Sequence, residues 1–250
     1  MTTATTVGPV QILGASFFST HHASAQDALA GRARDVTPPS YQLLVGRARR
    51  FTSLVTQMHI EVCGALGTDP AAPPLAVFAT CHGEIQTAEK LIADFREAAM
   101  VSSARFALSV HNTPSGVYSV ATGSSAPSTT VTGANAIAAG WLEAALTALD
   151  AGRTVLLSIA DEPVPAVFQG PTDPAGFAAA FLLGPGAAGG RRAQLAITPS
   201  ARSTEEPSPL LALARATDAW MREEPATISL GRLQPDAALE LRFLPRDPRA

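Results

Sequence analysis

The stretch STTVTGANAIAAGWLEAALTALDAGRTVLLSIAD, residues 128–161, decides the fold. Its first five residues are rich in β-branched side chains, which is typical of a short strand. Asn135 is placed to cap a helix that runs to about Asp150, and Gly152 to end it in a left-handed conformation. The apolar run Thr154–Asp161 then predicts a buried strand. This alternation of strand, helix and strand favours α/β layers.

The rest of the chain continues the alternation. Apolar runs predict strands at 10–18, 75–80, 177–183, 193–198, 227–230 and 239–243, and a half-buried strand at 106–110. Helical periodicity predicts helices at 41–66, with Ser40 as N-cap after Pro39, at about 85–99, from Pro114 onward, and at 210–222. We expect a single domain over residues 1–250, with residues 246–250 as a polar tail.

Composition narrows the function classes. Hydrophobic residues make up 46% of the chain and charged residues only 16%, which is typical of a folded protein and leaves room for an apolar subunit interface. A net charge of −3 argues against a broad nucleic-acid footprint. Arginines cluster at Arg32 and Arg34 and at Arg47, Arg49 and Arg50. A solvated helix face is the favoured interpretation, and a docking patch for an acidic carrier protein is the alternative.

Nothing in the sequence indicates a membrane, a metal or a cofactor. The start lacks the basic region and long apolar stretch of a signal peptide, and no run reaches the roughly 18 apolar residues of a membrane span. Cys63 and Cys81 lie too far apart for a metal knuckle or a redox C-x-x-C motif, and no Lys-Ser/Thr follows the glycines near Gly184. We therefore expect a cytoplasmic protein with reduced thiols and no cofactor.

Two pairs of adjacent residues deserve weighing as catalytic or metal sites. Cys81 and His82 are neighbours, but adjacent residues at a strand end point to opposite faces, so a buried cysteine beside a loop histidine is favoured over a catalytic pair. His21 and His22 have no third ligand close in sequence, which favours a surface loop over a metal site.

Four segments together resemble a known family. They are RRFTSLVTQMHIEVC (49–63), HNTPSGVYSVATGSSAPSTTVTGANAIAAG (111–140), DAGRTVLLSIADEP (150–163) and GFAAAFLLGP (176–185). They resemble the N-terminal half of β-ketoacyl synthases, which adopt the thiolase fold. SVHNTPSG, ATGSSAPST and ADEPVPAVF are most similar to the chain-length-factor-like subunits of aryl polyene biosynthesis. The resemblance covers roughly residues 8–200, leaves the last fifty unplaced, and implies a half-thiolase-like mixed sheet flanked by helices.

The chain departs from this family where the chemistry happens. A condensing enzyme needs a thiolate at the N-terminus of a buried helix, where the helix dipole lowers its pKa and backbone N–H groups hold the oxyanion. Ungapped counting from Thr130–Thr132 puts Asn135 at that position, and a short deletion would remove the position altogether. Either alignment loses the nucleophile. The family's two catalytic histidines come from its C-terminal half, and none of the five histidines here matches them. An ordinary helix cap, worth about 1 kcal/mol, is the equally weighted role for Asn135.

The resemblance implies a non-catalytic subunit that forms an obligate heterodimer with a full-length ketosynthase. Its contacts would be strand Ser128–Thr132, including Thr130, Val131 and Thr132, paired antiparallel with its counterpart, and the HNTPSG segment with His111 and Asn112. These two residues are alternatively a satisfied polar pair in a loop.

The resemblance also implies an acyl channel and a substrate. The candidates for the channel wall are Phe106, His111, Tyr118 and Trp141, and the substrate would be a polyene chain on an acyl carrier protein. A small acyl-transferring or hydrolytic enzyme using Cys81 and His82 is the rival hypothesis. A degenerate homodimer is the third.

Overall fold

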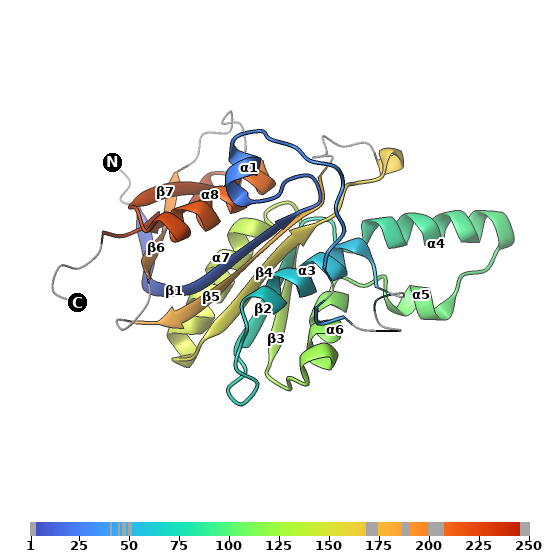
Figure 1. Cartoon of the computed structure of the whole chain (residues 1–250), viewed down its shortest axis with the longest axis horizontal. Coiled ribbons are helices and arrows are strands. Elements are labelled where there is room, and N and C mark those ends of the chain that lie inside the picture. The colour runs from blue at the N-terminus through green and yellow to red at the C-terminus, as the bar shows by residue number, and fades with distance from the viewer. Residues whose placement is uncertain are drawn as a thin grey trace.

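The structure is a computed structural model that describes residues 4–40, 42–44, 46, 49, 52–168, 175–186, 191–199 and 208–245. One eight-stranded sheet, in the order β3-β2-β4-β5-β1-β6-β8-β7, runs through the molecule (Figure 1). Its strands are β1 (Thr5–Ser19), β2 (Leu75–Thr80), β3 (Ser128–Thr132), β4 (Val155–Asp161), β5 (Phe177–Pro185), β6 (Arg191–Pro199), β7 (Ala226–Gln234) and β8 (Ala237–Phe243). Strands β3, β2 and β4 are parallel, and the remaining pairings are antiparallel, so the expected mixed sheet is confirmed.

Helices cover both faces of this sheet. They are α1 (Ala25–Leu29), α3 (Leu54–Ala65), α4 (Ile85–Ala98), α5 (Ser103–Ala107), α6 (Thr113–Thr122), α7 (Ala136–Ala151) and α8 (Pro209–Arg222), with a short 3-10 helix at Ala166–Phe168. Helices α7 and α8 pack on one face, and α3 and α6 on the other. Helices α4 and α5 extend away from the sheet (Figure 1). Among the described residues, no helix is both long and apolar enough to cross a membrane.

Strand β4 shows how the sequence builds this core. All seven of its residues are buried, as expected for a strand covered on both faces. Val155, Leu157 and Ile159 join the cluster under α7 and α8, whereas Leu156 and Ala160 join the cluster under α3 and α6. The two-residue period of a strand therefore divides one apolar run between two cores.

Helix α7 lies close against the sheet because it carries a glycine at the contact. A Cβ added to Gly140 would lie 2.7 Å from the Cβ of Ala79 in β2. The next residue, Trp141, is fully buried and stacks at a tilt on Phe181, with 4.6 Å between the ring centroids. The helix ends as expected at Gly152, whose φ of 61° lies in the left-handed region that favours glycine.

The expected helix from residue 41 to 66 is too long. In the structure α3 begins only at Leu54, where the Ser53 hydroxyl accepts the N–H of Thr56 and caps the helix. Gly46, with a φ of 60°, has a conformation that no right-handed helix contains, and this interrupts the pattern. Ser40 caps no helix and donates to Glu61 instead. Tyr41 and Phe51 lie outside the described residues, as does the tail 246–250.

The strand expected at residues 106–110 is also wrong. The first two residues of the segment end the short helix α5, and residues 108–110 form no strand. Helix α5 is capped by Ser102, whose hydroxyl accepts the N–H of Arg105. Phe106 and Val110 are 62% and 44% exposed, so their alternation does not mark a face against the sheet. The segment does alternate apolar residues, but no described part of the chain covers the side chains of Phe106 and Val110.

The last fifty residues, which the resemblance leaves unplaced, extend the sheet and cover one face. Strand β8 pairs with β6, and β7 forms the outer edge. Helix α8 packs its buried residues, including Leu210 and Leu213, into the same cluster as α7. The strands expected at 227–230 and 239–243 and the helix at 210–222 are therefore confirmed.

The tight contact at Gly140 leads to a testable expectation. We expect Gly140→Ala to destabilise the protein by about 1–3 kcal/mol, because the added methyl group must displace Ala79 or the helix itself. Gly116→Ala in α6 is the matched control, since nothing lies within 4 Å of its Cβ position and alanine favours helix. Urea unfolding of both variants measures the difference, and equal stabilities would contradict the close packing of α7.

Candidate functional site

The position that the sequence resemblance assigns to a nucleophile is the N-terminus of α7, which follows β3 at the carboxyl ends of the parallel strands. Asn135 is the residue before the helix, with φ of −103° and ψ of 16°. Its side chain does not cap the helix. Instead its Nδ2 donates to the carbonyl oxygen of Leu233, 2.9 Å away in β7. Asn135 therefore stands at the N-cap position, but the expected hydrogen bond from its side chain to the helix is absent. Its amide instead links α7 to the hairpin of β7 and β8.

Residues from four parts of the chain surround this helix start. Cys81, Asn135, Pro209 and Arg232 line a small depression with several apolar neighbours. Cys81 is half-buried and packs against the core cluster, whereas the side chain of His82 is exposed. The structure thus brings Cys81 close to Asn135 and leaves His82 in solvent.

Acidic residues organise the carboxyl ends of β2 and β4. Asp161, 4% exposed, accepts the backbone N–H groups of Cys81 and His82 at 2.9–3.0 Å and the hydroxyl of Thr80 at 2.8 Å. Burial raises the pKa of the Asp161 carboxyl, and the three donors oppose that rise. This residue closes the turn between β2 and α4 rather than offering a free carboxylate.

Two further buried carboxyls lie next to this turn. Glu162 accepts the N–H groups of Val55 and Gln86, and Glu84 accepts the hydroxyls of Thr56 and Thr87. Burial raises the pKa of both, that of Glu162 to about 7 with a further rise from the nearby charge of Glu84. Sequence reasoning missed these residues, although an acidic residue directly after a buried apolar strand was a readable signal.

A buried polar group joins α3 to β4. His59 Nδ1 lies 2.8 Å from the Ser158 hydroxyl, which also hydrogen-bonds the thiol of Cys63. All three residues are at most 2% exposed. Burial raises the pKa of Cys63 to about 12 and lowers that of His59 to about 3. The histidine is therefore neutral and the thiol protonated, so the group stabilises the core and presents no nucleophile.

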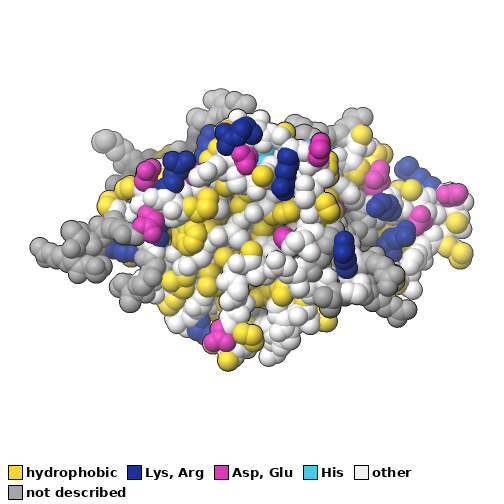
Figure 2. Space-filling model, in the orientation of Figure 1, with side chains coloured by type: hydrophobic (Ala, Val, Ile, Leu, Met, Phe, Trp, Pro, Cys, Tyr) yellow, Lys and Arg dark blue, Asp and Glu magenta, His cyan; other side chains and the backbone are white. Residues whose placement is uncertain are grey.

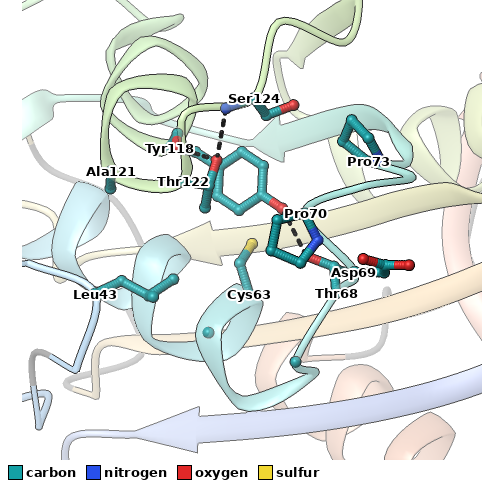
Figure 3. Close-up of a pocket in the computed structure, with 12 residues that line it drawn as sticks. Leu43, Cys63, Thr68, Asp69, Pro70, Pro73, Tyr118, Ala121, Thr122 and Ser124 are labelled. Atoms are coloured by element: carbon teal, nitrogen blue, oxygen red, sulfur yellow. Dashed lines mark hydrogen bonds between the residues drawn. The ribbon is translucent and has the colours of Figure 1, made fainter.

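Cys63 also forms the floor of a cavity of about 280 Å³ between α3, α6 and the loop before β2 (Figure 3). Tyr118 points into it, with its hydroxyl 3.4 Å from that of Thr68. The cavity lies at the amino edge of β2, because Pro73 lines it and precedes that strand. The cavity therefore lies at the opposite end of the parallel strands from Asn135.

The candidate wall residues occupy separate environments. Trp141 and Tyr118 are buried on opposite faces of the sheet, in the clusters under α7 and under α3, respectively. Phe106 is exposed on α5, and His111 is exposed beside Gly83. The structure does not bring these four side chains together within this chain.

The candidate interface residues lie at one edge of the sheet. Thr130 and Val131 are half-buried and Thr132 is exposed on β3, which pairs only with β2 among the described strands. Asn112 is exposed just before α6.

Arg32, Arg34 and the paired histidines lie in loops. Arg32 and Arg34 follow α1, so they are not on the expected helix face, and Arg32 pairs with Asp27. Arg47 and Arg50 lie outside the described residues, and Arg49 is described. His21 and His22 are half-buried beside Thr20 and Ser19.

Comparison with known proteins agrees with this architecture. The family model of the β-ketoacyl synthase N-terminal domain matches residues 22–223, more than half of the chain. The chain belongs to the β-ketoacyl synthase N-terminal domain family. No protein with curated function matched the chain in the sequence comparison.

Solved structures show the same fold for this ketosynthase-like chain. One is a chain in the complex of the ketosynthase ApeO with its chain length factor ApeC from Xenorhabdus doucetiae. The identity is 20%, and the TM-score is 0.72 over 94% of this chain and 99% of that chain. Another is a β-ketoacyl synthase from Burkholderia phymatum STM815, with 12% identity and a TM-score of 0.54 over 86% of this chain and 70% of that chain. The thiolase-like fold expected from the sequence is confirmed.

The buried imidazole gives the protein an acid sensitivity that can be measured. His59 has a pKa of about 3 when folded and 6.5 when exposed, so its contribution to stability is complete above pH 6.5 and is lost as the pH falls toward 3. We expect the wild type to lose about 3 kcal/mol more than His59→Gln between pH 7 and pH 4. Urea unfolding at both pH values tests this, and parallel losses would contradict a neutral buried His59.

Proposed function

We propose that this chain is a non-catalytic, chain-length-factor-like subunit that pairs with an active ketosynthase in chain elongation of the polyene or fatty-acid type. The observation that carries the proposal is the amide of Asn135 at the start of α7, bound to Leu233, where a condensing enzyme needs sulfur. The partner supplies the cysteine and histidines of the condensation, and this subunit stabilises the partner.

The two cysteines of the sequence support this reading. Cys63 is fully enclosed, and its high pKa leaves almost no thiolate at neutral pH. Cys81 is near the helix start. Its own backbone N–H and that of His82 both donate to Asp161, so they do not point at an oxyanion. The enclosed Cys63 does not have the surroundings of an activated nucleophile, and the two N–H groups that Asp161 accepts at Cys81 and His82 form no oxyanion hole.

Two parts of the chain offer surface for a partner. Strand β3 presents its outer edge, and an open edge is a template for pairing with another chain. Residues 85–107, here called the α4–α5 arm, expose large apolar side chains: Ile92, Phe95, Met100, Val101 and Phe106. Figure 2 shows hydrophobic side chains between charged ones on this arm. Burying such side chains against a partner contributes roughly 25 cal/mol per Å².

The heterodimer is supported by the fold shared with the complex of a ketosynthase and its chain length factor. In the proposed complex β3 pairs antiparallel with its counterpart, and the HNTPSG segment with His111 and Asn112 lies beside it. The acyl carrier protein delivers the growing chain to the complex rather than to this subunit alone. Phe106, which is exposed here, becomes a wall residue only when the partner covers it.

The absence of an acyl acceptor can be tested directly. After incubation with a medium-chain acyl-carrier-protein thioester, we expect intact mass spectrometry to find no added acyl group on this chain, while an active ketosynthase gains one. A hydroxylamine-sensitive adduct would contradict the proposal. If Cys81→Ser then removed that adduct, the chain would be a small acyl-transferring enzyme using Cys81.

The role of β3 in partner binding can be tested by comparison with β7, the outer strand on the other side of the sheet. Lysines at Thr129 and Thr132, both exposed on β3, should weaken binding to a full-length ketosynthase of the same organism at least ~tenfold, because charged side chains block edge pairing. Lysines at Thr227 and Ser229, both exposed on β7, are the matched control and should leave binding unchanged. Titration calorimetry measures both, and equal losses would argue against β3 as the interface.

A further inference from the structure

Helix α4 leaves the body of the protein with little packing to hold it (Figure 1). Of its fourteen residues, Leu91 is the one that the described structure buries. The arm formed by α4 and α5 therefore takes its direction mainly from the first turn of α4. The attachments of that turn are polar, and they come from buried side chains.

Glu162 binds the N-termini of two helices with one carboxylate. Its Oε2 accepts the N–H of Val55, the second residue of α3, at 3.3 Å. Its Oε1 accepts the N–H of Gln86, the second residue of α4, at 2.9 Å. Both N–H groups belong to first turns, which have no partner within their helix. Gln86 adds a side-chain bond to the carbonyl of Pro163.

Glu84 makes the same connection through hydroxyl groups. It directly precedes α4, is 3% exposed, and does not cap its own helix. Its Oε1 accepts the Thr56 hydroxyl of α3 at 2.5 Å, and its Oε2 accepts the Thr87 hydroxyl of α4 at 3.1 Å. Two buried carboxyl groups thus join α3, which is packed in the core, to α4, which is not.

The charges around this pair are few. Glu84 is the like charge that acts on Glu162, and Lys90 of α4 opposes it. From α3 the pair meets the N–H of Val55 and the hydroxyl of Thr56, neither of which titrates. Asp161 precedes Glu162 but is bound to the turn of β2, where His82 acts on it. Two ionised carboxylates so close and so buried repel each other.

We propose that Glu84 and Glu162 are positioning residues that clamp the α4–α5 arm to α3, and that the charge on this pair sets how firmly the arm is held. The consequence for ketosynthase binding rests on the proposed function, in which the arm contacts the partner. The pair touches no substrate, and its effect is on the geometry of the contact surface.

The direction of the pH effect follows from burial. Glu162 has a pKa of about 7 in the clamp and near 4.5 once solvated, so the clamped state prefers the protonated form. The clamp is therefore strongest below pH 4.5 and weakens as the pH rises from 4.5 through 7. Between pH 6 and pH 8, linkage allows a weakening of about tenfold.

Hydrogen exchange on the whole chain tests the clamp without a partner. After correction for intrinsic rates, we expect amide protection in α4 of the wild type to fall up to about tenfold from pH 6 to pH 8. Glu162→Gln should remove that dependence, because it is neutral throughout. Glu97→Gln, an exposed acid on the same helix, is the charge-matched control and should behave as the wild type. Equal pH dependence in Glu162→Gln and the wild type would overturn the clamp.

A second variant keeps the test decisive if Glu162→Gln fails to fold. Glu84→Gln removes the like charge and lowers the pKa of Glu162 in the clamp, so the loss of protection should be complete at a lower pH. An unchanged midpoint would overturn the coupling of the two acids.

Binding of a full-length ketosynthase over the same pH range then tests the arm. If the affinity for the ketosynthase falls together with the amide protection of α4, this supports the arm as part of the interface. Protection that changes while affinity stays constant overturns that place and leaves the clamp standing.

Discussion

The close contact between α7 and β2 is the constraint on which the arrangement depends. Gly140 leaves no room for even a methyl group against Ala79, and the fully buried Trp141 fills the adjacent space on Phe181. This contact fixes the height of the helix over the sheet. It thereby sets the start of α7 at the carboxyl edge of β2 and β3, the edge at which α/β proteins place their ligands.

At that edge the polar groups serve the structure of the chain itself. The amide of Asn135 holds the last hairpin, Asp161 closes the turn after β2, and Glu162 joins two helices. Each accepts or donates bonds that an open site would leave for a substrate. The last fifty residues contribute to this closure, because Pro209 and Arg232 lie over the start of α7.

The proposed contact surface is asymmetric. The two outer strands of the sheet, β3 and β7, differ in their neighbours. Strand β3 lies between α6 and α7 in the chain, and the arm of exposed apolar side chains precedes α6. The arm has a polar attachment and an apolar outer surface, an arrangement suited to binding because the apolar side chains remain available. The acids that attach it are buried, which raises the pKa of both carboxyls, so the position of the arm responds to protonation more than a hydrophobic contact would.

Elements whose pattern spans a buried face were predictable from the sequence. Strand β4, helix α7 with Gly152 at its end, and the family itself all follow from local apolar runs and motifs that need no partner to be recognised. The start of α3 and the helix at 103–107 were not predictable in this way. Their apolar spacing fits two structures, and the choice depends on whether a sheet lies beneath them.

The amino-acid sequence by itself determined that no sulfur stands at residue 135, because that is a property of the residue alone. Only the tertiary structure decided what Asn135 does, since its acceptor on Leu233 is 98 residues away in the chain. The same holds for Glu84 and Glu162, which become a pair only when α3, α4 and β4 meet. Hydrogen bonds and burial depend on distances in space, and those distances arise from packing of the whole chain.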